Sequence, residues 1–75
     1  MGLVFAQATN EELAVNGTTY QNVLAIECLS DGNLETTLND SPAPLTRTLV
    51  AGQVVQIRGT VLIGNATTAS VAILK

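Results

Sequence analysis

The chain has 75 residues with one cysteine and no histidine, which leaves one small domain without an intrachain disulfide or a clustered zinc site. Its net charge of −3, with three basic residues, excludes the basic stripe that nucleic acids and anionic membrane surfaces require. Apolar residues make up 47% and charged residues 12%, which is too apolar for a disordered chain and thinly charged for a free monomer.

The apolar residues are mostly Val, Ile, Leu and Ala, and ten threonines are scattered among them. β-branched residues favour the pleated, half-buried surface of a sheet. Phe5 and Tyr20 are the only aromatic residues, so the chain lacks the stacking platforms that bind bases or sugars.

Residues 1–10 read as an extended N-terminal arm or edge strand, ahead of a single β domain over 11–75. The apolar run at 3–6 is shorter than the core of a secretory signal and follows no basic residue, so we expect no secretory signal. No stretch reaches the length of a membrane span.

Two strand-like runs flank Asn16-Gly17, the pair preferred in a two-residue type I′ hairpin turn. The sequence therefore predicts a hairpin of residues 11–15 with 18–22. Strand character continues over 23–29, and a helix over 20–29 is disfavoured because its apolar residues keep no helical stripe.

The middle of the chain predicts a turn at 30–33, a short strand at 34–38 and another strand at 45–50. Between these strands, residues 39–44 hold both prolines and predict a crossing loop.

Apolar and polar residues alternate at the start of the last third of the chain. Val55 and Ile57 share one face of a strand over 53–59, and Gly59 marks a bulge, bend or corner. A strand follows at 60–63, and the final run over 69–74 is apolar on both faces, as in a strand buried on both sides. About six to seven short strands with regular turns predict an all-β fold, a small antiparallel sandwich or barrel, assembled as an oligomer.

No catalytic, cofactor-binding or metal-binding set stands out, and we expect no enzyme and no cofactor. Without histidine, Cys28 is best interpreted as a small buried apolar residue. Asp31, Asn33 and Glu35 alternate like the start of a calcium loop, but Thr36 stands where such a loop needs glycine. A polar turn before a strand explains them better.

Glu27 is the one acidic residue within an apolar strand. Two interpretations are open: pairing with Arg47 or Arg58 across a sheet or between subunits, or a solvated outer face. The doubly apolar last strand and the apolar start predict a subunit interface formed by Leu3, Val4, Phe5, Val71, Ile73 and Leu74.

As a very short, apolar, Thr-rich β chain, the sequence resembles small virion accessory proteins of tailed phages, of the capsid decoration or cement type and the short capsid-fibre type. The resemblance lies in general character and carries no motif. It implies a structural protein that binds itself, with a trimer favoured, and a larger assembly such as a capsid, located in the virion.

The alternative function is a small barrel module of the OB or SH3-like type, in the cytoplasm, that binds a protein partner. In neither case do we expect nucleic acid or a membrane as partner.

The Asn16-Gly17 turn gives the first testable prediction. Gly17→Val should lower the free energy of unfolding by about 1 kcal/mol or more, because a β-branched residue resists a positive φ. Thermal melting measures the effect, and an unchanged Tm would place the turn elsewhere.

Overall fold

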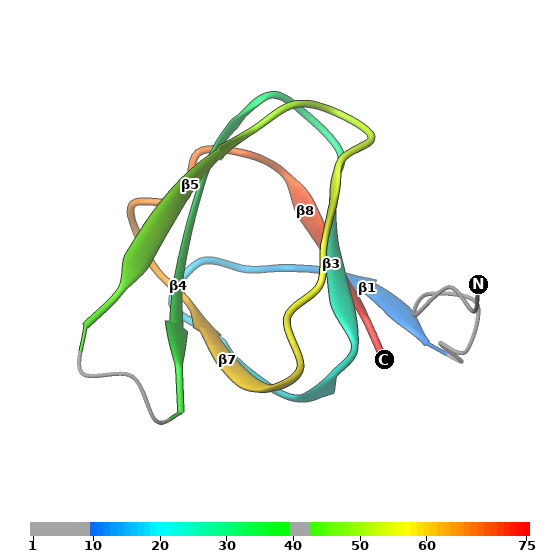
Figure 1. The fold of residues 1–75 in the computed structure, drawn as a ribbon, viewed down its shortest axis with the longest axis vertical. Coiled ribbons are helices and arrows are strands. Elements are labelled where there is room, and N and C mark those ends of the chain that lie inside the picture. Colours follow the sequence, from blue (N-terminus) through cyan, green and yellow to red (C-terminus); the bar gives the residue numbers. More distant parts are fainter. Residues whose placement is uncertain (1–9, 40–42) are drawn as a thin grey trace.

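A computed structural model describes residues 10–39 and 43–75 of the chain. These residues form eight strands and no helix, arranged as two four-stranded antiparallel sheets that pack against each other (Figure 1). The prediction of an all-β sandwich is confirmed, with one or two strands more than expected. Of the predicted arm over 1–10, only Asn10 lies within the described residues.

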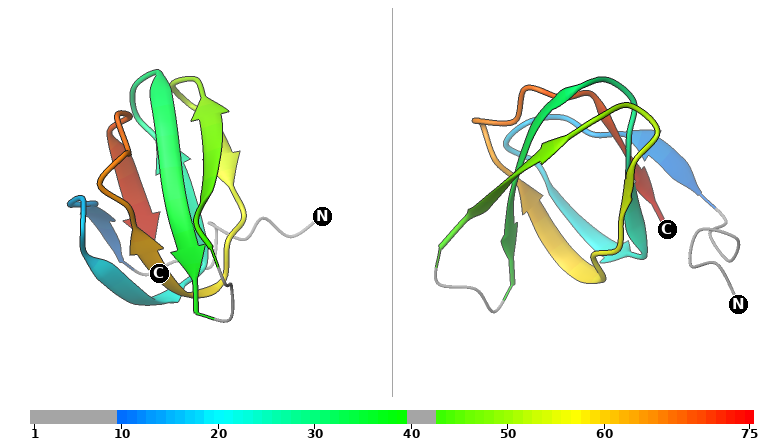
Figure 2. Two further views of the ribbon diagram at one scale, coloured as in Figure 1. Left: turned by 90° about the vertical axis from the view of Figure 1, so that its left-hand side faces the viewer. Right: turned by 45° about the horizontal axis from the view of Figure 1, so that its top comes forward.

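The two sheets contain four strands each. Sheet A has, in spatial order, β1 (Glu11–Leu13), β8 (Val71–Leu74), β3 (Ala25–Cys28) and β6 (Val54–Val55). Sheet B has, in spatial order, β2 (Thr19–Val23), β7 (Gly59–Ile63), β4 (Gly32–Leu38) and β5 (Leu45–Leu49). The two views of Figure 2 show the strands wrapped around one interior.

Most connections carry the chain from one sheet to the other, and only β4 and β5 follow each other within one sheet. At two of these corners the backbone has a positive φ. Asn22 has a φ of 59° where β2 ends before β3, and Gly59 has a φ of 100° where the chain enters β7. The predicted corner at Gly59 is therefore confirmed, and the predicted strand over 23–29 is split because Val23 belongs to sheet B and 25–28 to sheet A.

The predicted hairpin around Asn16-Gly17 is wrong, because β1 pairs with β8 and β2 pairs with β7. A turn does form at this point: the Thr18 amide donates to the Val15 carbonyl at 3.2 Å. Only its glycine has a positive φ, 83°, as in a type II turn, whereas a type I′ hairpin turn needs two such residues. The turn carries the chain between sheets because β8 takes the place beside β1.

The hydrophobic core lies between the sheets and is made by alternate residues of the strands, together with Ile57 and Ala69 of the connecting segments. It consists of Tyr20, Val23, Ile26, Cys28, Leu34, Leu49, Ile57, Val61, Ile63, Ala69, Val71 and Ile73. The predicted alternation over 53–59 is confirmed in its burial, since Ile57 is buried and Gln56 and Arg58 are exposed. Only Val54 and Val55 of that segment pair as a strand.

The connection between β7 and β8 completes sheet B. β7 pairs with β4 only at 36–38, and residues 67–69 supply hydrogen bonds to the first half of β4 instead. The amides of Thr68 and Ala69 donate to the Asn33 carbonyl at 2.9 and 3.1 Å, and the Glu35 amide donates to the hydroxyl of buried Thr67 at 3.0 Å. This close approach requires glycine at position 32.

Residues 39–44, predicted to cross the fold, connect the neighbouring antiparallel strands β4 and β5. Of this loop the structure describes 39, 43 and 44.

Gly32 gives a prediction about packing. Its φ is 155°, and a Cβ there would lie 2.7 Å from the Ala69 amide nitrogen, whereas a Cβ on Gly52, with a φ of 90°, would meet nothing within 4 Å. Gly52→Ala should therefore cost about 1 kcal/mol of unfolding free energy from backbone strain alone, and Gly32→Ala about 2–3 kcal/mol. Urea titration of the two variants measures the difference, and equal losses would contradict the contact.

Candidate functional site

The predicted interface residues divide into three groups. Leu3, Val4 and Phe5 lie outside the described residues. Val71 and Ile73 point into the core of their own subunit, where they are 1% and 0% exposed. The opposite side of β8 carries Ala72 and Leu74, so the strand is buried on both sides as its sequence predicted. The apolar character of Val71 and Ile73 is thus explained within one chain.

The outer side of sheet A is a mixed apolar and acidic surface. Strand pairing sets Leu13 opposite Ala72, Ala72 opposite Glu27, and Glu27 opposite Val54. The neighbouring row sets Glu11 opposite Leu74 and Leu74 opposite Ala25. All of these residues point to the outer side of sheet A, where Ala25, Ala72 and Leu74 are nevertheless buried. We call the rest, Glu11, Leu13, Glu27 and Val54, the acidic face.

Two large apolar side chains on the acidic face are open to solvent: Leu13 is 64% exposed and Val54 is 39% exposed. Leu13 lies on β1, at the edge of the sheet, and Val54 lies on β6, at the opposite edge. Glu27 is half-buried on the outer side of sheet A, between Val54 and Ala72, and forms no ion pair with a described residue. Its pairing with an arginine of another subunit stays a prediction. Within residues 10–39 and 43–75, the one ion pair joins Lys75 and Glu12, at 3.1 Å.

Arg47 and Arg58 lie on different elements of the molecule. Arg47 of β5 pairs with core residue Leu34, so its side chain starts on the inward-facing side of sheet B. It is half-buried, and its guanidinium donates to the Thr36 hydroxyl at 3.1 Å. Arg58 is exposed in the segment between β6 and β7.

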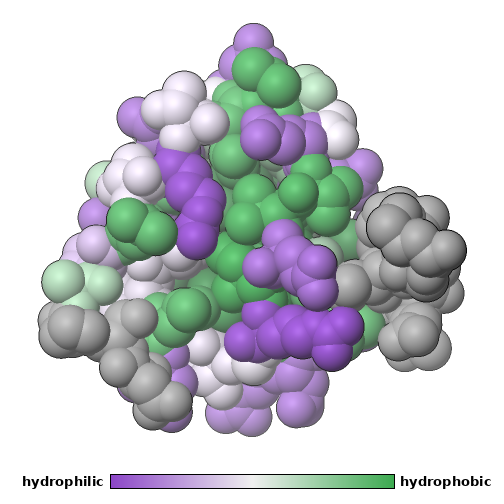
Figure 3. Space-filling model, in the orientation of Figure 1, coloured by the Kyte–Doolittle hydropathy of each residue, from purple (hydrophilic) through white to green (hydrophobic). Residues whose placement is uncertain are grey.

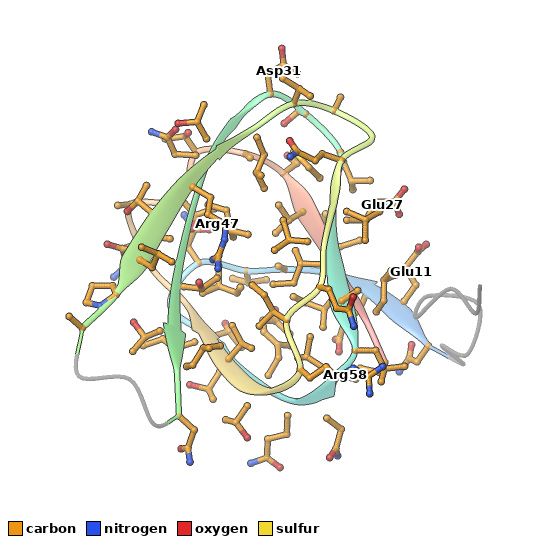
Figure 4. All side chains as sticks on the ribbon, in the orientation of Figure 1. Glu11, Glu27, Asp31, Arg47 and Arg58 are labelled. Carbon is orange, nitrogen blue, oxygen red and sulfur yellow. The ribbon has the colours of Figure 1, made fainter. Side chains whose placement is uncertain are left out.

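Figure 4 shows how these charges are arranged. Arg47 points into the ring of strands that faces the viewer, and Arg58 lies apart from it, at the lower right of the view. Glu11 and Glu27 point to the right of the view, away from that ring. In the same orientation, apolar residues occupy the middle of the visible face, with hydrophilic residues around them (Figure 3).

The residues that sequence analysis weighed for chemistry have structural partners. The Cys28 thiol is buried and donates to the Ser30 carbonyl, with 2.9 Å between sulfur and oxygen. The Asp31 carboxylate accepts from the Ala51 amide at 2.8 Å, and the Asn33 side-chain oxygen accepts from the Thr48 hydroxyl at 3.1 Å. Glu35 accepts from the Ala66 amide at 3.3 Å. These bonds hold turns and strands together, as a polar turn before a strand would.

Two kinds of feature are absent from residues 10–39 and 43–75. No group of three or more acidic or cysteine side chains in this part of the chain is placed to hold a metal ion. No helix there is long and apolar enough to cross a membrane.

Comparisons of the chain with protein-family models, with curated proteins and with solved structures found no match. The candidate site therefore stands on its geometry alone.

Sequence reasoning missed Leu13 and Val54 as exposed apolar residues at the edges of sheet A. Leu13 lies in a short run, Glu11-Glu12-Leu13, whose pattern does not indicate which side faces solvent.

The contrast between core and surface gives a third prediction. Ile73→Ala should lower the unfolding free energy by about 2–5 kcal/mol, because it leaves a cavity in a fully buried site. Leu13→Ala should change it by less than about 0.5 kcal/mol in the monomer. Denaturant unfolding at low protein concentration measures both, and comparable losses would show that Leu13 is packed like a core residue.

Proposed function

We propose that this chain is a structural, non-catalytic assembly protein that associates with itself and stabilises or decorates a larger protein assembly such as a viral capsid. The observation that carries the proposal is the exposure of several large apolar side chains on a chain of this size. They are Leu13, Val15, Leu29, Leu38, Leu45, Val50 and Val54.

Single exposed apolar residues are ordinary on the surface of a monomer. An edge strand that leaves a large apolar side chain open to solvent is not, because an exposed edge can pair with another chain. Leu13 stands 64% exposed on edge strand β1, beside Ala72 of the central strand. The same strand carries Glu11 and Glu12, so this edge repels another acidic surface and stays open to one that is not acidic. A neighbouring subunit on this face would remove the apolar surface from water.

A small barrel module that binds a protein partner is the second candidate, and a specific feature favours it. The chain moves between sheets at nearly every connection, with the short corners at Asn22 and Gly59, so the two sheets are joined around their rims as in a small barrel. Such a module would use the same exposed apolar residues for a foreign chain.

Native mass separates these two functions. Light scattering on a sizing column, over a range of dilutions, should give a stable oligomer for the assembly protein, and we favour a trimer. Co-sedimentation with capsids then tests the larger assembly. A monomer at every concentration would contradict the assembly proposal and support the barrel module.

The fourth prediction concerns Leu13 in that oligomer. Leu13→Ser should raise the dissociation constant about tenfold or more, because the loss of a buried leucine costs about 1.5–3 kcal/mol. Leu29→Ser, at a leucine that is 47% exposed and follows β3, is the matched control and should leave the mass unchanged. Equal effects of the two substitutions would mean that the acidic face is not the contact.

A further inference from the structure

The turn at residues 15–18 contains the only asparagine of the chain that is followed by glycine. In an Asn-Gly pair the backbone nitrogen of glycine can attack the side-chain carbonyl carbon of asparagine, because glycine has no Cβ to shield that nitrogen. Asn16 is exposed to solvent, so water reaches its carboxamide. The pair therefore contains the groups for one chemical reaction, the deamidation of Asn16.

The reaction has two steps and consumes only water. The Gly17 nitrogen loses its proton to solvent and forms a bond to Cγ of Asn16. The bond between Cγ and Nδ2 breaks, and Nδ2 takes up a proton from solvent and leaves as ammonia. Water then adds to either carbonyl carbon of the resulting cyclic imide, and the bond from that carbon to the ring nitrogen breaks. The product at position 16 is aspartate or isoaspartate.

In the folded chain, hydrogen bonds to one segment hold both reacting groups. The Gly17 amide donates to the Ile63 carbonyl at 2.7 Å, and Nδ2 of Asn16 donates to the Thr67 carbonyl at 2.9 Å. The first bond keeps the proton on the attacking nitrogen, and the second fixes the carboxamide that this nitrogen has to reach. Both acceptors belong to residues 63–67, at the end of β7 and in the connection that follows it.

The acceptor segment is itself held firmly. Ile63 and Thr67 are both buried, and the Ile63 amide donates back to the Thr18 carbonyl at 3.0 Å. The reaction therefore requires the whole turn to leave residues 63–67. Its rate in the folded chain is the rate in an open chain multiplied by the fraction of time that the turn is open.

We propose that Asn16 is a deamidation site that the folded turn suppresses, so that aspartate or isoaspartate at position 16 marks chains whose turn has opened. The modification also prevents the turn from re-forming. An ionised aspartate has no donor for the Thr67 carbonyl and sets an oxygen against it. Isoaspartate adds an atom to the main chain, which displaces the Gly17 amide from Ile63. This inference goes beyond the proposed function and requires no partner, because every bond involved lies within one chain.

Peptide mapping of the full chain measures the reaction. One sample is kept folded and another is unfolded in guanidinium chloride, both at a mildly alkaline pH that favours loss of the amide proton. Digestion after glutamate gives the peptide 13–27, which carries Asn16 and Asn22 in one fragment. Mass spectrometry then detects the replacement of the amide by a carboxyl group at each residue.

The two samples should differ at Asn16. In the unfolded sample Asn16 should be converted much faster than Asn22, because β-branched Val23 shields the nitrogen that follows Asn22. In the folded sample the conversion of Asn16 should be at least about tenfold slower than in the unfolded one. Equal rates at Asn16 in both samples would overturn the suppression by the turn. An Asn16 that stays unchanged in the unfolded sample would overturn the site itself.

Gly17→Ala is the chemical control, and it is measured in the unfolded sample so that strain in the folded turn plays no part. Its Cβ shields the attacking nitrogen while Asn16 is retained, so the conversion of Asn16 should become much slower. A variant that reacts as fast as the unmodified chain would contradict attack by the backbone nitrogen.

A substitution that reproduces the aspartate product tests its effect on the fold. Asn16→Asp removes the donor to the Thr67 carbonyl, and Asn10→Asp makes the same change of charge at another exposed asparagine. Thermal melting should give a lower Tm for Asn16→Asp and an almost unchanged Tm for Asn10→Asp. Equal Tm values for the two variants would show that the modification does not loosen the turn.

Discussion

The insertion of β8 between β1 and β3 is the constraint on which the structure depends. β1 and β3 do not pair with each other, and both take backbone hydrogen bonds from β8. Closing this sheet joins residues near position 11 to residues near position 74, which costs loop entropy that local pairing would avoid. The apolar residues on both sides of β8 offset that cost, because Val71 and Ile73 fill the core while Ala72 and Leu74 are buried on the outer side.

The same arrangement produces the surfaces proposed for assembly. With β8 central, β1 becomes an edge strand and exposes Leu13, and β3 places Glu27 beside Val54 at the far edge. The exposed apolar residues therefore lie at both edges of this sheet, where a neighbouring subunit would remove them from water.

Much of the local structure could be predicted because alternation of side chains depends only on neighbours in the sequence. The predicted strand over 34–38 lies within β4, which begins two residues earlier inside the predicted turn, and the strand predicted over 45–50 is β5, which ends at Leu49. The alternation of Val55 and Ile57 with polar residues is also present. The Asn16-Gly17 pair predicted the turn correctly but predicted wrongly that the strands on either side of it pair with each other. A turn preference fixes a change of chain direction and not which strand the chain pairs with afterwards. The candidate site depends on that pairing and so could not be predicted.

The sequence by itself determined an all-β domain with a core of aliphatic residues, a doubly apolar last strand, and the absence of histidine and of a second cysteine. It did so because composition and the period of two are properties of neighbouring residues. Only the tertiary structure decided that β8 lies centrally, that Val71 and Ile73 serve the core of their own subunit, and that Leu13 and Val54 are exposed at opposite edges of sheet A. Those facts follow from strand order across both sheets, which depends on contacts between residues far apart in the chain.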